Sequence, residues 1–413
     1  MRKTLAMTAI ALSVLGVTAM SAAAQDTVKL GYIDPLSGGG ASIGEGGLKT
    51  FQYLADELNA KGGILGHKVE IVPLDNKVNP QETLIQAQKA IDAGIRYVTQ
   101  GNGSSVAAAL EDFVEKNNTR NPGKELLYFN YAAVDPSLTN EKCSFWHFRW
   151  DANSDVKMEA LTNYMKGVPS IKKVYLINQD YSFGQSVRSE ARKMLAAKRP
   201  DVQIVGDELH PLLKVTDFSP YIAKIKASGA DSVVTGNWGQ DIALLLKAAA
   251  DAGLKVNWYT YYAGGAGGPT AIKQANLDHQ VFQITEGIPN AGYPPAVDFE
   301  KAFRAKVGMS LWYPRAVNEM RMFKLAAEKA KSLDPVKVAS ALEGMKFEVL
   351  DGGEGFMRKE DHQFFQPIYI SSFGSLTAKE PFDEEKTGWG WHLVSKIDTA
   401  QTVLPTTCQM KRP

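Results

Sequence analysis

The stretch VKLGYIDPLSGGGASIGEGGLKTFQYLADELNAKGGILGHKVEIVPL, residues 28–74, decides the fold. It opens with an apolar strand over residues 28–33 and passes through a glycine-rich loop into a helix over residues 44–60. Gly62 and Gly63 end the helix, and residues 68–74 predict a second strand. A strand, a helix and a strand in this order predict a βαβ unit with parallel strands.

The same alternation continues outward along the chain. Further helices are predicted from Asn79 and Ser104, and further strands over residues 96–99 and 126–129. After Asp151 it begins again, with helices over 154–166, 183–197, 218–227 and 240–252, and strands over 173–177, 202–209, 231–234 and 256–261. Two such runs predict an α/β chain with two doubly wound parallel-sheet lobes. Helices over 297–306 and 316–331 are expected to return to the first lobe.

The N-terminus predicts export. Arg2 and Lys3 precede an apolar stretch over residues 5–20, and Ala22 and Ala24 fit the small-x-small pattern of a cleavage site. We therefore predict a signal peptide over residues 1–24, cleaved after Ala24, and a mature protein in the periplasm. An uncleaved N-terminal anchor is the alternative.

Composition excludes nucleic acid as a partner. Removal of the signal peptide changes the formal net charge from +1 to −1, and charges of both signs are interspersed along the chain. Such a chain has no basic patch for phosphates. The roughly 390 mature residues exceed one ordinary hydrophobic core and favour two domains.

The chain has two cysteines, Cys143 and Cys408. An oxidising compartment allows them to form a disulfide, which would close a loop of 265 residues and tie down the C-terminal tail. Two separate buried thiols are the alternative.

Loops beyond the carboxyl ends of parallel strands are the candidate ligand sites. The glycine-rich loop over residues 37–47 matches neither nucleotide motif, because Leu48 precedes Lys49-Thr50 and Lys49 stands where the dinucleotide pattern needs glycine. No nucleotide cofactor is expected. We interpret the loop as a backbone surface whose amides face a polar ligand group.

A second loop, Gly101–Ser105, places Ser104 and Ser105 at a helix N-terminus, which favours a bound carboxylate. Alternatively Ser104 caps its own helix, and both roles can coexist. Aromatic side chains follow several predicted strands, either as ligand walls or as core: Tyr131, Tyr181, Phe183, Trp238, Tyr261 and Tyr262.

Enzyme signatures are missing from the sequence. It contains no Gly-x-Ser-x-Gly elbow and no His-Glu-x-x-His motif, and its six histidines lack metal-ligand spacing. We expect no catalytic residue, no metal and no cofactor. A catalytic site assembled only in three dimensions stays open as an alternative.

Several segments occur in a recognisable order: GYIDPLSG at 31–38, LNAKGGILG at 58–66, GIRYV at 94–98, DPSLT at 135–139 and YSFG at 181–184. In them the chain resembles the periplasmic binding proteins of branched-chain amino-acid ABC transporters, the leucine/isoleucine/valine-binding type, from about Val28 to Phe373. The resemblance implies a type I fold, in which three crossovers join the lobes and the lobes close on a ligand like a hinge.

The implied crossovers lie near residues 148–151, 284–288 and 349–355. Lobe 1 would then comprise residues 25–148 and 285–350, lobe 2 residues 149–284 and 351–375, and a C-terminal extension residues 376–413. The resemblance also implies a membrane permease as partner and a monomer. A ligand-sensing receptor domain is an alternative role for the same fold.

The resemblance assigns roles to pocket residues. Ser104 falls where a serine holds the ligand carboxylate, and Ala132 falls where a backbone carbonyl receives the ligand ammonium. Phe183 and Trp238 fall where tyrosines wall the pocket. Val134 replaces a threonine and Tyr262 replaces a glutamate, both of which bind the ammonium in the family. Val78 and Gly103 occupy the family's disulfide positions.

An α-ammonium without a carboxylate partner would be buried unpaired, which is unfavourable by a few kcal/mol. We therefore expect a small carboxylate without an α-ammonium, preferably an aromatic acid. Its expected anchors and walls are Ser104, Ser105, Tyr131, Phe183, Trp238 and Tyr262. A branched-chain amino acid or an amide is the alternative ligand. Arg149 and Arg315 are either further carboxylate partners or members of structural ion pairs.

Overall fold

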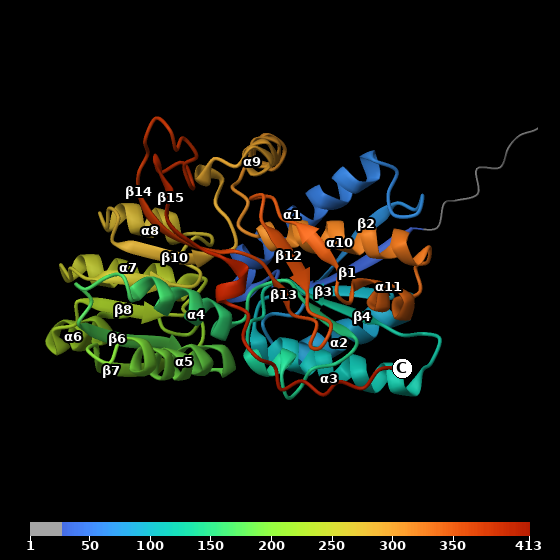
Figure 1. Ribbon diagram of the computed structural model, residues 1–413, viewed down its shortest axis with the longest axis horizontal. Helices are drawn as coiled ribbons and strands as arrows, with labels where there is room; N and C mark the ends of the chain where they lie inside the picture. The colour runs from blue at the N-terminus through green and yellow to red at the C-terminus, as the bar shows by residue number, and fades with distance from the viewer. Residues whose placement is uncertain (1–26) are drawn as a thin grey trace, which may run out of the picture.

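The computed structural model describes residues 27–413 and shows two lobes side by side (Figure 1). The signal peptide expected over residues 1–24 lies outside the described residues. Within residues 27–413, no helix combines the length and the apolar character needed to cross a membrane.

Lobe 1 contains a five-stranded sheet with the order β2-β1-β3-β4-β5, and all its neighbouring strands are parallel. The strands are β1 (Val28–Asp34), β2 (Val69–Asp75), β3 (Tyr97–Gln100), β4 (Leu127–Asn130) and β5 (His147–Arg149). The helices are α1 (Ala41–Ala60), α2 (Pro80–Asp92), α3 (Ser104–Arg120), α9 (Pro294–Val307), α10 (Pro314–Ala330) and α11 (Pro335–Leu342). Because α9 and α10 contact α1, the later helices return to lobe 1 as expected.

Lobe 2 contains a seven-stranded sheet with the order β15-β14-β10-β9-β8-β6-β7. Five strands are parallel: β6 (Lys173–Gln179), β7 (Gln203–His210), β8 (Ser232–Thr235), β9 (Asn257–Thr260) and β10 (Val281–Thr285). Two antiparallel strands complete it, β14 (Ile368–Ser375) and β15 (Trp389–Ile397). The helices are α4 (Ser154–Met165), α5 (Ser182–Lys198), α6 (Ser219–Ser228), α7 (Gln240–Asp251) and α8 (Gly268–Gln274). The two predicted doubly wound lobes are confirmed.

Local sequence features explain where several of these helices and strands lie. Helix α2 begins where predicted: the Asn79 side chain accepts a hydrogen bond from the Glu82 amide at 3.0 Å, and Pro80 occupies the first turn. After α2, Gly94 has φ +74° and turns the chain toward β3. Strands β3 and β4 are buried at every residue, as central strands between two helical layers must be. The short helix α8 was not predicted, because its glycine-rich start is typical of a loop.

The chain crosses between the lobes at three places. Residues 150–153 join β5 to α4, and residues 286–293 join β10 to α9, each overlapping a predicted crossover. The third connection, between α11 and β14, is longer than expected and contains a small antiparallel sheet of β11 (Lys346–Glu348), β12 (Glu354–Met357) and β13 (Phe364–Phe365). The first and third connections run side by side, since Gln363 Nε2 donates to the Asp151 carbonyl at 2.8 Å.

Residues 376–413 do not form a separate extension, which corrects the expectation for this segment. Strand β15 pairs with β14 along the whole length of β14, and Trp389 and Trp391 pack into the lobe 2 core. Strand β15 was not predicted, because the residues that precede it favour turns. The C-terminal hairpin, defined here as β14, β15 and the connection between them, is therefore part of lobe 2.

The chain then leaves lobe 2 and ends on lobe 1 (Figure 1). Cys143 and Cys408 form a disulfide with their Cα atoms 5.7 Å apart, so they are not the separate thiols of the alternative. Close by, the Asn140 side chain accepts from the Thr407 amide at 3.0 Å. This C-terminal strap, residues 398–413, forms a fourth connection between the lobes.

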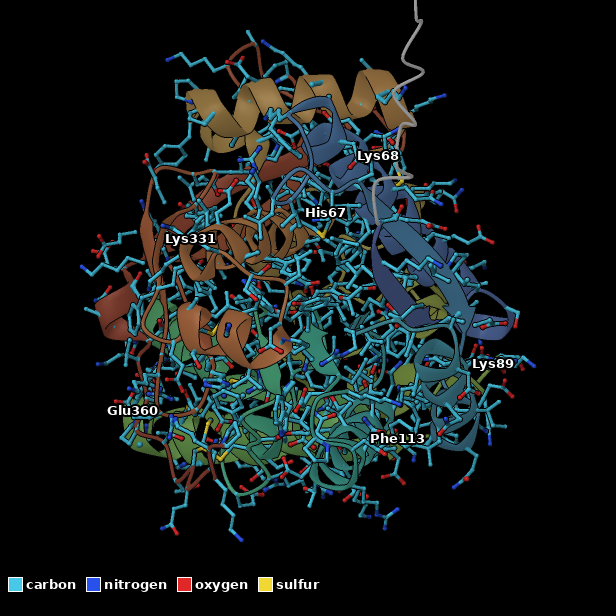
Figure 2. All side chains as sticks on the ribbon, turned by 90° about the vertical axis from the view of Figure 1, so that its right-hand side faces the viewer. His67, Lys68, Lys89, Phe113, Lys331 and Glu360 are labelled. Atoms are coloured by element: carbon cyan, nitrogen blue, oxygen red, sulfur yellow. A yellow bond between two sulfur atoms is a disulfide. The ribbon has the colours of Figure 1, made fainter. Side chains whose placement is uncertain are left out.

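Figure 2 looks onto lobe 1 and shows the distribution of its surface charges. Lys68, Lys89 and Glu360 are exposed and spread over this face. Positive and negative side chains therefore both occur on this face.

Candidate functional site

A cleft lies between the lobes at the carboxyl ends of their strands. Asn102, Gly103 and Ser104 line it after β3, and Ala132 and Val134 line it after β4. Lobe 2 contributes aromatic side chains that follow β6, β8 and β9: Tyr181, Phe183, Trp238, Tyr261 and Tyr262. Ligands of doubly wound sheets bind at this edge.

The structure brings most of the predicted pocket residues together. The residues that line the cleft are Ser104, Ala132, Val134, Phe183, Trp238 and Tyr262. Ser105 and Tyr131 are not among its lining residues. Ser105 is the second residue of α3 and is half-buried, so its predicted role as an anchor has no support in this geometry.

The loop between β3 and α3 presents hydrogen-bond donors to the cleft. Gly103 is the N-cap of α3, with φ +99°, and no side chain caps the helix. Ser104 therefore does not cap its own helix, and its Oγ accepts a hydrogen bond from the Asp135 amide at 3.2 Å. The Ser104 hydroxyl hydrogen and the first-turn amides of α3 form a donor group that suits a carboxylate.

Tyr131 supports this loop from the lobe 1 core and does not wall the cleft, which corrects the prediction. Its buried hydroxyl donates to Asp34 and accepts from Asn102 Nδ2 at 2.9 Å. Asp34 also accepts from the Asn102 amide at 2.9 Å. Burial raises the pKa of Asp34 to about 6, although the bonds from Tyr131 and Asn102 oppose the rise. The Tyr131 hydroxyl group therefore has its hydrogen-bond partners in the lobe 1 core, beneath the loop, and needs none in the cleft.

The wall contributed by lobe 2 is aromatic. The ring centroid of Phe183 lies 5.9 Å from that of Tyr181 and 5.8 Å from that of Tyr262. Trp238 Nε1 donates to the Tyr181 hydroxyl at 2.7 Å, which fixes the indole plane. From lobe 1, Trp312 and Tyr313 line the facing side. Such rings offer faces and edges to a flat ligand.

Val134 and Tyr262 replace the residues that bind the ligand ammonium in the family, and neither offers a free acceptor side chain. Val134 presents only methyl groups, and its carbonyl accepts from the Ser154 amide at 2.9 Å. The Tyr262 hydroxyl donates to Asp151 Oδ2 at 2.9 Å, so the phenol is already engaged. Neither Asp151 nor any other carboxylate lines this part of the cleft among the described residues.

Four buried charges meet where the lobes join, and we call Asp151, Lys157, Glu286 and Arg315 the hinge charge cluster. Lys157 Nζ lies 2.8 Å from Asp151 Oδ1 and 2.9 Å from Glu286 Oε1. Arg315 pairs with the same two acids, at 3.1 Å and 2.8 Å. Lys157 belongs to α4 of lobe 2 and Arg315 to α10 of lobe 1, whereas both acids lie on crossovers. The cluster therefore joins both lobes and has no net charge when all four groups are ionised.

The two acids of this cluster differ in their proton affinity. Burial raises the pKa of Asp151 to about 7, and Glu286 adds to the rise while Arg315 and Lys157 oppose it. Burial also disfavours ionised Glu286, but Lys157 and Arg315 outweigh it and hold the pKa of Glu286 below its usual range. Glu286 is therefore the ionised partner of both cations near neutral pH.

The two candidate arginines have different positions. Arg149 does not line the cleft; it is buried in lobe 1, donates to the Asp135 carbonyl at 2.6 Å and to Gln363 Oε1 at 2.7 Å. Arg315 lines the cleft and belongs to the hinge charge cluster. Arg149 is therefore structural, and Arg315 combines an ion-pair role with a place in the cleft wall.

Sequence reasoning missed several lining residues. Lys157 lies inside a helix, Trp312 and Tyr313 lie in the turn before α10, and Glu384 and Trp391 belong to the C-terminal hairpin. None of these residues follows a predicted parallel strand, and position after such a strand is the pattern that predicts ligand-binding residues in this fold. The Trp-Tyr-Pro turn before α10 is a local hint, because a proline that begins a helix fixes the turn that carries the two rings.

The residues at the family's disulfide positions do lie together. A Cβ atom on Gly103 would be 3.1 Å from Val78 Cγ1. Among residues 27–413, no cluster of three or more His, Cys, Asp or Glu side chains is arranged to hold a metal ion.

Known proteins share this sequence and architecture. A model of the family described as periplasmic binding protein matches residues 27–375. A Brucella abortus protein named Leu/Ile/Val-binding protein homolog 4 is 30% identical over 98% of this chain and 97% of its own length. A Brucella ovis crystal structure, titled leucine-, isoleucine-, valine-, threonine-, and alanine-binding protein in a closed conformation, is also 30% identical, with a TM-score of 0.84, covering 94% of this chain and 100% of that one.

A more distant structure has the same fold. It is a solute binding protein of an ABC transporter from Rhodopseudomonas palustris HaA2 in complex with p-hydroxybenzoic acid, 21% identical, with a TM-score of 0.76 over 91% of this chain and 98% of that one. The resemblance noted in the sequence and the predicted type I fold are both confirmed. The chain belongs to the periplasmic binding protein family, in its branched-chain amino-acid type.

Proposed function

We propose that this protein is the extracytoplasmic receptor of an ABC transporter for a small carboxylate without an α-ammonium, preferably an aromatic acid. It captures the ligand between its lobes, closes by hinge motion and delivers it to a membrane permease. We also propose that it acts as a periplasmic monomer and leaves its ligand chemically unchanged.

One observation carries this proposal: the charged groups near the expected amino-acid backbone site are basic or already paired. Lys157 and Arg315 line the cleft, whereas their partners Asp151 and Glu286 do not. An anionic ligand therefore meets the helix-terminal amides of α3, which favour it, and the two cations of the hinge charge cluster, which are also paired with Asp151 and Glu286. An ammonium placed beside Val134 and Tyr262 would lose its hydration without gaining a carboxylate.

The aromatic wall supports the choice of a flat ligand. Phe183, Trp238 and Tyr262 form one side of the cleft, and ring stacking contributes about 0.5–1.5 kcal/mol per pair beyond the burial of area. The complex of p-hydroxybenzoic acid with a protein of the same fold supports the view that this architecture accommodates such a ligand.

A branched-chain amino acid is the second candidate ligand. It is favoured by the names of two proteins that are 30% identical to this chain, one a Leu/Ile/Val-binding protein homolog and one a leucine-, isoleucine-, valine-, threonine-, and alanine-binding protein. In that case Ala132, which lines the cleft, would offer its carbonyl to the ammonium.

The test is calorimetry on protein refolded free of ligand, with benzoates and cinnamates compared with leucine, isoleucine and valine. We expect binding of the aromatic acids and none of the amino acids, and recovery of each ligand unchanged. Tight binding of leucine or valine with no binding of aromatic acids would overturn the proposal.

Trp238→Ala tests the aromatic wall itself. We expect at least about a tenfold loss of affinity for the aromatic acid, as for a buried aromatic contact residue. Trp146→Ala is the matched control, because Trp146 is 7% exposed against 6% for Trp238 but does not line the cleft. Equal effects of the two substitutions would remove Trp238 from the site.

A further inference from the structure

A series of buried oxygen atoms lies beneath the loop between β3 and α3. Asp34, the last residue of β1, accepts at Oδ1 from the Asn102 amide at 2.9 Å, and its Oδ2 contacts the Tyr131 hydroxyl. The Tyr131 hydroxyl lies 2.9 Å from that of Tyr32, which lies 2.7 Å from the Gly44 carbonyl oxygen. All three side chains are fully buried. We call these four oxygens, joined in series by three contacts, the oxygen chain.

The oxygen chain needs a definite number of protons. A hydrogen bond between two oxygen atoms uses one proton, and a carbonyl oxygen has none to donate. When Asp34 is ionised, Tyr131 donates to it and Tyr32 donates to Gly44, so the two phenol oxygens face each other without a proton. When Asp34 is protonated, it donates to Tyr131, Tyr131 donates to Tyr32 and Tyr32 donates to Gly44. Only the protonated acid therefore makes every contact of the chain a hydrogen bond.

Asn102 connects the oxygen chain to the cleft. Its Nδ2 donates to Asp34 Oδ2 at 3.0 Å and to the Tyr131 hydroxyl at 2.9 Å, and both oxygens still accept when Asp34 is protonated. Asn102 also lines the cleft, next to Gly103 and Ser104. A single residue therefore separates Asp34 from a ligand bound at this loop.

The side chains around Asp34 do not compensate a negative charge there. Burial raises the pKa of Asp34 to about 6, although hydrogen bonds from Tyr131 and Asn102 oppose the rise. On β2 its neighbour Asp75 is turned to the surface, where it accepts from Ser37. Arg315 of α10 donates to the Tyr131 carbonyl and pairs with the acids of the hinge charge cluster. The other titratable side chains that face Asp34 are phenols and one buried acid: Tyr32, Tyr128, Tyr131, Tyr313 and Glu319.

We propose that Asp34 is a proton-binding positioning residue: the protein takes up a proton at Asp34 when it captures a carboxylate at the loop above. This inference rests on the proposed function, because it needs an anionic ligand at Ser104. A bound carboxylate disfavours a second negative charge beneath the loop, and the proton removes that charge. The same proton completes the oxygen chain, which holds Asn102 and the start of α1 against the sheet.

Ligand affinity should then depend on pH. A bound carboxylate favours the protonated acid, so it raises the pKa of Asp34 above its value of about 6 in the empty protein. Affinity is therefore greatest below about pH 6 and falls as pH rises through the pKa of the complex. We expect the Kd of an aromatic acid to increase about fivefold to tenfold between about pH 5.5 and about pH 8, as the interaction of two nearby charges allows.

Calorimetry measures both the affinity and the proton. Benzoate and cinnamate, which stay ionised over this range, are titrated into wild-type protein in HEPES and in Tris at about pH 7. Because the two buffers differ in heat of ionisation, the difference in binding heat gives the number of protons taken up. We expect uptake of a fraction of one proton. No uptake, or an affinity that increases with pH, would overturn the proposal.

Two substitutions assign the proton to Asp34. Asp34→Asn imitates the protonated acid, because its amide accepts from the Asn102 amide and donates to the Tyr131 hydroxyl. It should remove most of the proton uptake and most of the pH dependence. Tyr32→Phe leaves only the contact between Asp34 and Tyr131, for which the Tyr131 proton suffices, so it should move the fall in affinity to lower pH.

Asp155→Asn is the matched control. Burial also raises the pKa of Asp155, to about 7, but Asp155 belongs to α4 of lobe 2 and is not part of the oxygen chain. This substitution should leave the pH dependence of binding unchanged. A pH dependence that is the same in wild-type protein, Asp34→Asn and Tyr32→Phe would overturn the proposal.

Infrared spectroscopy tests the proton without a ligand. The difference between spectra of empty wild-type protein at about pH 5 and about pH 8 should contain a protonated-carboxyl band that Asp34→Asn reduces, and an unchanged band would overturn the proton site. Binding of aromatic acids without proton uptake would overturn the coupling and leave the proposed function standing. Absence of binding by any aromatic acid, with the infrared band present, would overturn the proposed function and the coupling but not the proton site.

Discussion

Two groups of buried ionisable side chains beside the cleft differ in how completely they are paired with opposite charges. At the hinge charge cluster, each of four charges has two oppositely charged partners within 3.1 Å. At the C-terminal hairpin, the buried Glu384 has a single cationic partner, Arg304, at 3.2 Å. The number of oppositely charged partners therefore distinguishes the two places. Missing hydrogen bonds do not, because Asp151 Oδ1, Lys157 Nζ, Glu286 Oε1 and Glu384 Oε2 all have no hydrogen-bond partner among the described residues.

The hinge charge cluster is a closed ion-pair network that joins both lobes, whereas Glu384 is one of several acids around Arg304. Removing one member of a closed ion-pair network leaves a buried charge without compensation. Removing the Glu384 carboxyl group leaves Arg304 with Glu300 and Asp383 as partners. Substitutions at the two places should therefore lower the free energy of unfolding by different amounts.

The largest effect is expected at the hinge. Lys157→Met should lower the free energy of unfolding by about 3–5 kcal/mol, because Asp151 and Glu286 would remain buried beside a single cation. Chemical denaturation measures the loss. Lys116→Met is the matched control, since Lys116 pairs with Asp112 in solvent and such pairs contribute about 0–1 kcal/mol. The idea of a closed cluster fails if the two losses are equal.

The C-terminal strap is a second means of joining the lobes, and it should contribute somewhat less. Replacing both Cys143 and Cys408 with serine should lower the free energy of unfolding by about 2–4 kcal/mol, since the bond restricts the unfolded chain. The same denaturation experiment with reduced wild-type protein should give a similar loss. Unchanged stability in both cases would show that the disulfide does not stabilise the folded protein.

At the C-terminal hairpin the effect on stability should be small. Glu384→Met should change the free energy of unfolding by less than about 1 kcal/mol, because a buried acid is replaced by an apolar side chain of similar length and Arg304 keeps Glu300 and Asp383 as partners. The comparison with Lys157→Met is direct, since both replace a buried ionisable side chain by methionine. A loss from Glu384→Met as large as that at the hinge would erase the distinction between the two places.

A further expected effect concerns pH. Burial raises the pKa values of Asp151, Asp155 and Asp351 to about 7, above their ordinary value of about 4. Between these values the unfolded chain releases protons that the folded protein keeps, so the stabilisation present at low pH is lost as pH rises through about 4 to 7. His362 acts in the opposite direction, because burial lowers its pKa.

Calorimetric melting should therefore give a midpoint a few degrees lower at about pH 8 than at about pH 5.5. Asp155→Asn should flatten this dependence, since it removes one of the acids whose pKa is raised. A midpoint that rises steadily across this range would contradict the assignment of raised pKa values to these carboxyls.

Much of the fold follows from local sequence signals. The spacing of apolar residues in residues 28–74, with the glycines that end the helix, is enough to predict a βαβ unit. Repetition of that unit predicts the two lobes. Strand β15 escaped prediction because its pairing with β14 spans a turn-rich connection and is decided by Trp389 and Trp391 packing in the lobe 2 core. Its structure depends on tertiary contacts that no short window of sequence contains.

The residues of the site also fall into two groups: those that local sequence predicts and those that it does not. Ser104, Phe183 and Trp238 follow parallel strands, and the rule that ligands bind at this edge was enough to select them. Tyr131 follows a strand as well but points to Asp34, because a buried acceptor lies on the core side. The members of the hinge charge cluster come from four separate segments, and Glu384 comes from the C-terminal hairpin. Only the folded chain brings them together.

The central claim is that the cleft accepts a carboxylate and rejects the α-ammonium. The most direct measurement is calorimetry of ligand-free protein with pairs that differ only in that group: leucine with 4-methylpentanoate, and phenylalanine with 3-phenylpropionate. We predict that the acid without the ammonium binds more tightly in each pair. Tighter binding of leucine and phenylalanine than of their deaminated partners would contradict it and would mean that the ammonium has a partner in the cleft.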